Sequence, residues 1–117
     1  MNENNLIAMR AVIQESLNWI EINLAKPLAT RELSERAGYS IWHYQQIFKE
    51  IVGMTPFIYI KHRRMLVARK LVLESQFSLT DISLCLGYSQ QSTFYMAFKK
   101  YYGITPKQLR QDKISEI

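Results

Sequence analysis

Two stretches of the chain carry polar and aromatic side chains at the spacing of a single helix face. The first set lies at positions i, i+3, i+4 and i+7: Trp42, Gln45, Gln46 and Lys49. The second set follows about fifty residues later: Gln91, Ser92, Tyr95, Met96 and Lys99. Amide groups can pair with adenine, aromatic and apolar groups can touch the thymine methyl group, and lysine can reach a phosphate. An ordinary hydrated face is the alternative, but an exposed tryptophan and tyrosine favour a contact surface.

Both stretches belong to a duplicated segment, in which residues 28–60 align with residues 77–110. The matching pairs are Gly38-Tyr39-Ser40 with Gly87-Tyr88-Ser89 and, after one extra residue in the second copy, Phe48-Lys49 with Phe98-Lys99, Gly53 with Gly103, and Thr55-Pro56 with Thr105-Pro106. A short turn with glycine separates two helical patterns in each copy. This arrangement predicts a helix-turn-helix motif in each copy.

Apolar residues at spacings of three and four mark the buried side of the second helix in each copy. They are Tyr44, Ile47, Phe48 and Ile51 in the first copy, and Phe94, Ala97, Phe98 and Tyr101 in the second. Thr30 is expected to cap the first helix of the first copy, and Ser40 the second. The polar faces described above then point outward.

The rest of the chain also shows helical patterns. Residues 6–24 and 57–74 predict two longer helices, and residues 107–113 predict a short one. No segment has the pattern of a strand, so we predict an all-α fold of about seven helices. We expect helix-turn-helix subdomains at 9–56 and 75–111 and a connecting helix at 57–74, together one domain over residues 9–111.

Positive charge is concentrated on the connecting helix. The chain has 117 residues, 15 Lys and Arg against 10 Asp and Glu, and a net charge of +5. Five cations fall within ten residues: Lys61, Arg63, Arg64, Arg69 and Lys70. Contact with phosphate explains this cluster, and a solvated face is the alternative. Arg64 also lies on an apolar stripe, which predicts partial burial and pairing with an acid.

Several classes of function find no support in the sequence. His43 and His62 lack neighbours at metal-ligand spacing, and there is no phosphate loop, nucleophile motif or carboxylate pair. We therefore expect no enzyme, catalytic residue, metal or cofactor. Cys85 is the single cysteine, and a lone cysteine in a helix is usually inert. No secretory signal or membrane-length apolar run is present, which predicts a cytoplasmic protein without a membrane partner.

The chain resembles the AraC/XylS family of bacterial transcription regulators over residues 9–111. The family-like residues are Ala68-Arg69-Lys70-Leu71, Ser78, Gly87-Tyr88, Phe98-Lys99-Lys100, Gly103-Ile104-Thr105-Pro106 and Arg110. Further residues are similar to the stand-alone MarA/SoxS/Rob-like branch: Trp19-Ile20, Asn23-Leu24, Pro27-Leu28, Gly38-Tyr39-Ser40 and Trp42-His43.

The resemblance implies two helix-turn-helix subdomains joined by a rigid helix. It also implies a monomer that places both recognition helices in adjacent major-groove segments of promoter DNA and contacts RNA polymerase. Members of the branch typically activate genes for stress, drug-efflux or virulence responses. Larger relatives carry a separate effector domain, for which this chain has no room, so no small-molecule effector is expected.

Two positions depart from the branch, which usually has arginine where this chain has Gln46 and Met96. Gln46 can still pair with adenine, whereas Met96 offers only apolar contact. The second recognition helix is therefore expected to discriminate less between sequences, or to recognise a different site. Trp42 and Gln45 match the branch.

The sequence thus predicts a sequence-specific DNA-binding transcriptional activator. The expected base-contacting residues are Trp42, Gln45, Gln46, Gln91, Ser92, Tyr95 and Met96. The expected contacts to the DNA backbone are Ser40, Lys49, Lys61, Arg63 and Lys99. The alternative is an adapter that binds a protein of the transcription machinery and has weak or non-specific affinity for DNA, which the apolar Met96 would suit.

Overall fold

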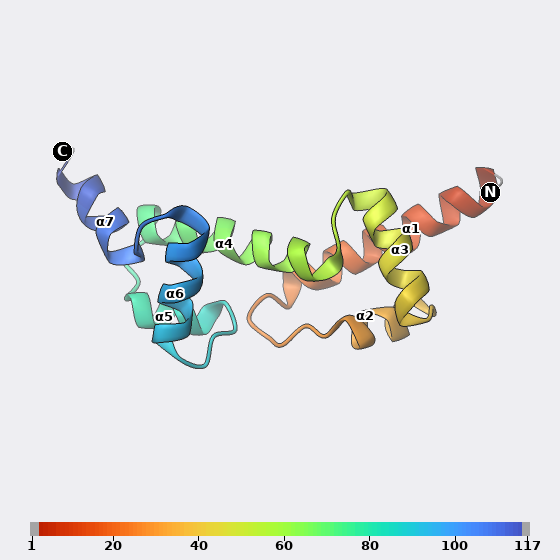
Figure 1. Ribbon diagram of the computed structural model, residues 1–117, viewed down its shortest axis with the longest axis horizontal. Helices are drawn as coiled ribbons and strands as arrows, with labels where there is room; N and C mark the ends of the chain where they lie inside the picture. The colour runs from red at the N-terminus through yellow and green to blue at the C-terminus, as the bar shows by residue number, and fades with distance from the viewer. Residues whose placement is uncertain (1–2, 116–117) are drawn as a thin grey trace. The chain divides into compact units, whose positions relative to one another are not determined.

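Glycine or proline stands at several helix boundaries of the chain, whose helices Figure 1 shows from the N-terminus to the C-terminus. The computed structural model describes residues 3–115, and this range contains seven α-helices and no strand. They are α1 (Glu3–Ile22), α2 (Thr30–Ala37), α3 (Ile41–Val52), α4 (Pro56–Glu74), α5 (Leu79–Cys85), α6 (Gln91–Tyr102) and α7 (Pro106–Ser115). The predicted all-α fold with two helix-turn-helix motifs and a helix between them is confirmed.

The chain divides into two compact units, residues 1–61 and residues 62–117, with the boundary inside α4. In the first unit α1 packs against both α2 and α3. The buried apolar side chains of this unit are Ile13, Ile20, Leu24, Leu33, Tyr44, Ile47, Phe48 and Ile60. The predicted inner side of α3 is therefore correct for three of its four residues, and Ile51 is half-buried.

The second unit has its own core, made by the later part of α4 together with α5 and α6. Its buried residues are Met65, Ala68, Val72, Ile82, Leu86, Phe94 and Phe98. Tyr101 was expected on the buried side of α6, and this prediction is wrong because its ring lies at the surface. Its hydroxyl is hydrogen-bonded there to Nδ1 of His62. Tyr102 packs on the core instead, and its hydroxyl donates to the carbonyl of Met65 at 2.8 Å.

The two helix-turn-helix turns have the same backbone hydrogen bonds. Tyr39 N–H donates to the Ser34 carbonyl at 3.0 Å, and Tyr88 N–H donates to the Ser83 carbonyl at 3.0 Å. The glycine before each tyrosine has a positive φ, 79° at Gly38 and 83° at position 87, which side chains with a Cβ rarely adopt. The duplication in sequence is thus a duplication in structure at the turn that orients each second helix.

The helix caps differ between the two copies. Ser40 accepts a hydrogen bond from His43 N–H at 3.1 Å, which confirms it as the cap of α3. The predicted cap at Thr30 is wrong, because Ala29 holds the cap position and Thr30 is already helical. In the second copy Ser78, which aligns with Ala29, caps α5 through Asp81 N–H at 3.0 Å.

Arg110 on α7 holds the C-terminal end of α4. Its guanidinium donates to the carbonyls of Val72 at 3.0 Å, Phe77 at 2.8 Å and Ser75 at 3.3 Å. These are carbonyls at and just beyond a helix end, where the backbone lacks partners within the helix. The side chain of Lys113 donates to another of them, at Leu73. Arg110 therefore joins α4 to α7 within the second unit.

Candidate nucleic-acid interface

The outer face of α3 carries the first predicted set of contact residues. Trp42 is 70% exposed, Gln46 and Lys49 are exposed, and Gln45 is half-buried. The opposite side of α3 is held in the core by fully buried rings, so the helix cannot rotate to bury this face. A tryptophan this exposed leaves a large apolar area in water, which favours a surface that binds a partner.

The start of α3 is fixed by two local contacts. The Ser40 hydroxyl caps the helix, and the rings of Tyr39 and His43 meet edge to face with centroids 4.9 Å apart. These contacts lie in the turn and the first helical turn, next to Trp42. They fix the orientation of the first turn of α3. The N-terminal residues of a helix that lies in the major groove are the ones that contact base edges.

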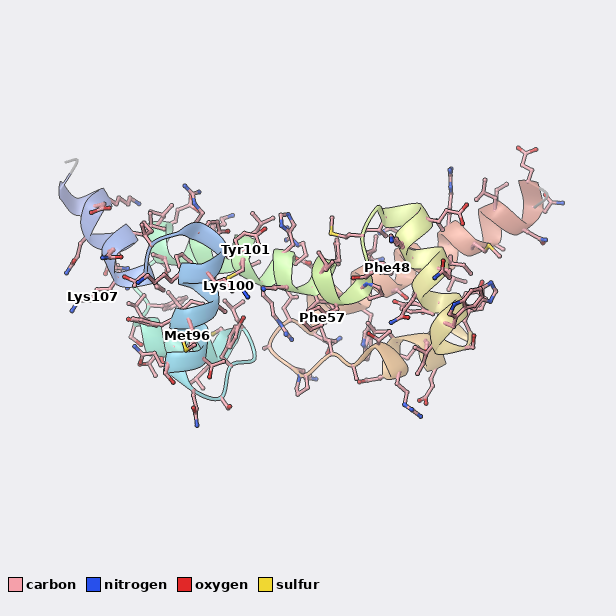
Figure 2. The ribbon with its side chains drawn as sticks, in the orientation of Figure 1. Phe48, Phe57, Met96, Lys100, Tyr101 and Lys107 are labelled. Atoms are coloured by element: carbon pink, nitrogen blue, oxygen red, sulfur yellow. The ribbon has the colours of Figure 1, made fainter. Side chains whose placement is uncertain are left out.

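The outer face of α6 holds the second predicted set. Met96 is 75% exposed and lies on the open side of the helix, as Figure 2 shows, while Gln91, Ser92 and Lys99 are also exposed. Tyr95 is half-buried and packs on the core of the second unit. The face is therefore open, but its central side chain can make only apolar contacts.

Gln91 differs from its neighbours because its side chain is hydrogen-bonded to a residue of α5. Its side-chain oxygen accepts a hydrogen bond from the hydroxyl of Thr80 at 2.5 Å. Gln90 occupies the cap position of α6 without a side-chain hydrogen bond, because the extra residue of the second copy displaces Ser89 from that place. The start of α6 is thus held from the side by Thr80, whereas α3 is held by its own cap.

The cations of α4 lie at different depths. Lys61 and Arg63 are half-buried, and Arg69 and Lys70 are exposed. Arg64 is half-buried as predicted; burial lowers the pKa of its guanidinium, and the charge interaction with Tyr88 opposes this shift. The pairing of Arg64 with an acidic side chain stays a prediction. Arg64 thus belongs in part to the packing of the second unit.

Comparison with known proteins supports a DNA-binding family. A family model described as a helix-turn-helix domain matches residues 33–112. The chain is 37% identical over 100 residues to the HTH-type transcriptional activator AarP of Providencia stuartii. The aligned region covers 86% of this chain and 74% of AarP. The chain is also 36% identical over 98 residues to the multiple antibiotic resistance protein MarA of Escherichia coli (strain K12). The aligned region covers 84% of this chain and 77% of MarA.

The chain belongs to the AraC-type helix-turn-helix family. The crystal structure of the DNA-binding domain of AdpA, in complex with a target DNA, has the same fold: its TM-score is 0.82 at 20% identity, covering 89% of this chain and 94% of that chain. The relatives are transcription regulators, so the prediction that the protein is not an enzyme is confirmed. The AraC-type domain is a DNA-binding domain, and transcription regulation is the function of its relatives.

Among residues 3–115 no three His, Cys, Asp or Glu side chains are grouped to hold a metal ion, and no helix is long and apolar enough to cross a membrane. Cys85 is exposed and makes no disulfide.

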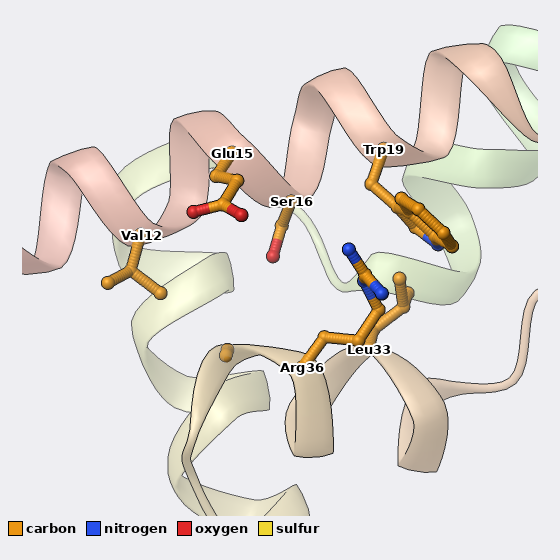
Figure 3. A pocket seen from close by; sticks show the side chains of 7 residues that line it. Val12, Glu15, Ser16, Trp19, Leu33 and Arg36 are labelled. Carbon is orange, nitrogen blue, oxygen red and sulfur yellow. The ribbon is translucent and has the colours of Figure 1, made fainter.

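A cavity of about 250 Å³ lies between α1 and α2 of the first unit, as Figure 3 shows. The guanidinium of Arg36 stacks on the Trp19 ring, 3.4 Å from its centroid, on one wall of this cavity. The indole N–H of Trp19 is buried and makes no hydrogen bond within the described chain. None of the lining residues belongs to α3, so the cavity is separate from the candidate interface.

Proposed function

We propose that the protein is a sequence-specific transcriptional activator that binds promoter DNA. In this proposal a single chain places α3 and α6 in adjacent major-groove segments, through the domain at residues 9–111. The observation that carries the proposal is the outer face of α3, where Trp42 stands exposed beside Gln45 and Gln46 on a helix whose other side is fixed in the core. The name of the relative AarP as an activator supports the direction of the effect.

The proposed base contacts are divided between two helices. Trp42, Gln45 and Gln46 of α3 would contact one groove segment, and Gln91, Ser92, Tyr95 and Met96 of α6 the next. Ser40, Lys49, Lys61, Arg63 and Lys99 would contact the DNA backbone. Amide groups pair with adenine and exposed apolar groups touch the thymine methyl group, so we expect a site rich in A·T pairs at the centre of the α3 segment.

Selection of bound duplexes from a random DNA pool tests this function. The expected result is a shared sequence, bound by one chain per duplex when the stoichiometry is measured by mass photometry. A pool that stays random after repeated selection would contradict the proposal and favour the protein-binding adapter.

We also propose that the protein contacts RNA polymerase at the promoter, and a purified transcription reaction tests this contact. A promoter that carries the selected site upstream should yield more transcript when the protein is added. The matched control is the same promoter with a scrambled site, which should give no increase. An equal increase from both promoters would show that any effect on the polymerase does not depend on sequence-specific DNA binding.

A further inference from the structure

The net charge of the protein is confined to the second compact unit. Residues 1–61 contain six Lys and Arg and six Asp and Glu, so the first unit is neutral. Residues 62–117 contain nine Lys and Arg against four Asp and Glu, which is the whole surplus of five. The two units each contain one copy of the duplicated motif but differ in net charge, and therefore in their electrostatic attraction to a polyanion.

Part of this difference lies at equivalent positions of the duplicated segment. Lys100 at the end of α6 aligns with Glu50 at the end of α3, and Lys107 at the start of α7 aligns with Phe57 at the start of α4. All four side chains are exposed. The first unit therefore presents an acid and a ring at the two places where the second presents cations. Neither lysine is among the DNA contacts predicted from the sequence, although the alignment of the two copies contains the signal.

The two lysines flank the outer face of α6. In Figure 2, Lys100 lies on one side of the α6 ribbon and Lys107, which belongs to α7, on the other, while Met96 lies nearer the N-terminal end of α6. A helix in the major groove has a phosphate strand on each side of it, because the groove is bounded by both strands. Cations on both sides of α6, together with Lys99, can therefore reach both strands.

The side chains that can form hydrogen bonds to bases are concentrated in the first unit, whereas the net positive charge lies in the second. The centre of the α6 face is Met96, which has no strong hydrogen-bonding group, and Tyr95 is partly taken up by packing. The amide oxygen of Gln91 accepts from Thr80. The α3 face has two adjacent glutamines and the exposed Trp42. Hydrogen bonds to base edges carry most sequence discrimination, whereas phosphate contacts carry affinity without it.

We infer that the two units divide the work of binding unequally: the first unit discriminates between sequences, and the second holds the phosphate backbone through Lys99, Lys100 and Lys107 with little discrimination. This inference rests on the proposed DNA-binding function and specifies how that function is shared. It assigns Lys100 and Lys107 as contacts to the DNA backbone.

Scrambling one groove segment at a time in the selected site tests this division. The segment that α3 contacts is identified with the Gln45→Ala variant. It is the segment that contains the position where this variant no longer prefers one base pair over the other three. Scrambling that segment should weaken binding of the wild-type chain more than 100-fold, because several mismatched pairs each cost about 1–3 kcal/mol. Scrambling the other segment should weaken it less than 10-fold. An equal or greater loss from the second segment overturns the division of work while leaving the proposed function intact. If no sequence is selected at all, the proposed function fails, and this inference fails with it.

The assignment of the two lysines is tested by the salt dependence of binding. The double variant Lys100→Gln, Lys107→Gln should lower the slope of log K against log salt by about two, since each phosphate contact contributes about 0.9. Affinity for specific and scrambled duplexes should fall by the same factor. The control is Arg10→Gln, an exposed cation on α1 of the first unit, which should leave the slope unchanged. Circular dichroism should show that both variants retain the wild-type helix content. An unchanged slope in the double variant, or a loss confined to the specific duplex, overturns the assignment.

Discussion

At the scale of single residues, α3 and α6 present different groups at equivalent places. Gln46 of α3 aligns with Met96 of α6, and both side chains are exposed. Gln45, which aligns with Tyr95, is only half-buried, so its amide group lies at the boundary between the core and the outer face.

Replacing Gln45 with alanine should relax recognition at one base pair of the site. The amide can form two hydrogen bonds to adenine, and their loss should cost about 1–3 kcal/mol at that position. Competition binding with the four possible base pairs at each position measures this effect. A variant that keeps the wild-type preference at every position would remove Gln45 from the proposed base contacts.

Lys49, by contrast, should act on all sequences alike. It is exposed at the end of the α3 face, where an ammonium group can reach a phosphate but carries no base information. Lys49→Ala should lower the salt slope by about one and weaken specific and non-specific duplexes by the same factor. Binding measured at four salt concentrations checks this, and a slope equal to that of the wild type would contradict it.

At the scale of the secondary-structure elements, each recognition helix is held by different contacts. Ser40 caps α3, whereas Ser89, at the aligned position of the second copy, does not cap α6, which begins one residue later. Thr80 of α5 supports α6 through Gln91 instead. The same motif is thus stabilised in two ways, and the two serines form a matched pair.

Ser40→Ala should lower the free energy of unfolding by about 1 kcal/mol, because the N–H of His43 loses its acceptor. Ser89→Ala is the control and should change stability by less than about 0.5 kcal/mol, as is usual for exposed positions without special contacts. Urea denaturation followed by circular dichroism compares the two. Equal losses in the two variants would show that the cap of α3 makes no separate contribution.

Arg110 should contribute more to stability than any cap, because it serves several carbonyls at the end of α4. Arg110→Met keeps much of the side-chain length and removes the donors, and it should cost about 2–3 kcal/mol because the hydrogen bonds to Val72 and Ser75 are part-buried. Lys107→Met, an exposed cation on the same helix, is the control for loss of charge. Thermal unfolding measures both, and a loss in Arg110→Met no larger than in the control would contradict the structural role.

Much of this architecture follows from local patterns that the sequence displays. Gly38 and Gly53 end helices because both adopt a positive φ, and Phe48 is buried because its spacing from Tyr44 places both on one side of α3. The positions that sequence analysis misplaced depend on partners from elsewhere in the chain. Tyr101 turns outward because His62, on another helix, offers it a hydrogen bond.

The candidate site shows the same limit. The i, i+3, i+4, i+7 spacing predicts the outer face of α3, since this face depends only on helix geometry. The engagement of Gln91 by Thr80 and the placement of Lys100 and Lys107 on two sides of α6 depend on how helices pack, which no local pattern contains. Arg64 lies between these cases: its stripe predicted partial burial, but its interaction with Tyr88 required the fold.

At the scale of the whole molecule, the two copies of one motif lie in units that differ in net charge. The surplus of five cations is carried by the second unit, while the side chains best suited to base recognition lie in the first. Phosphate contacts weaken steeply with salt, whereas hydrogen bonds to base edges do so much less. Both specific and non-specific binding should therefore weaken by similar factors as the salt concentration rises, while the preference for the specific site persists.

The most direct test of sequence-specific DNA binding is a titration of the intact protein against the selected duplex and a scrambled duplex of the same composition, at 50 and 200 mM salt. The account predicts that both affinities fall by similar factors and that the selected duplex keeps a preference of about 1,000-fold or more at both concentrations. Equal affinities for the two duplexes at both salt concentrations would contradict it.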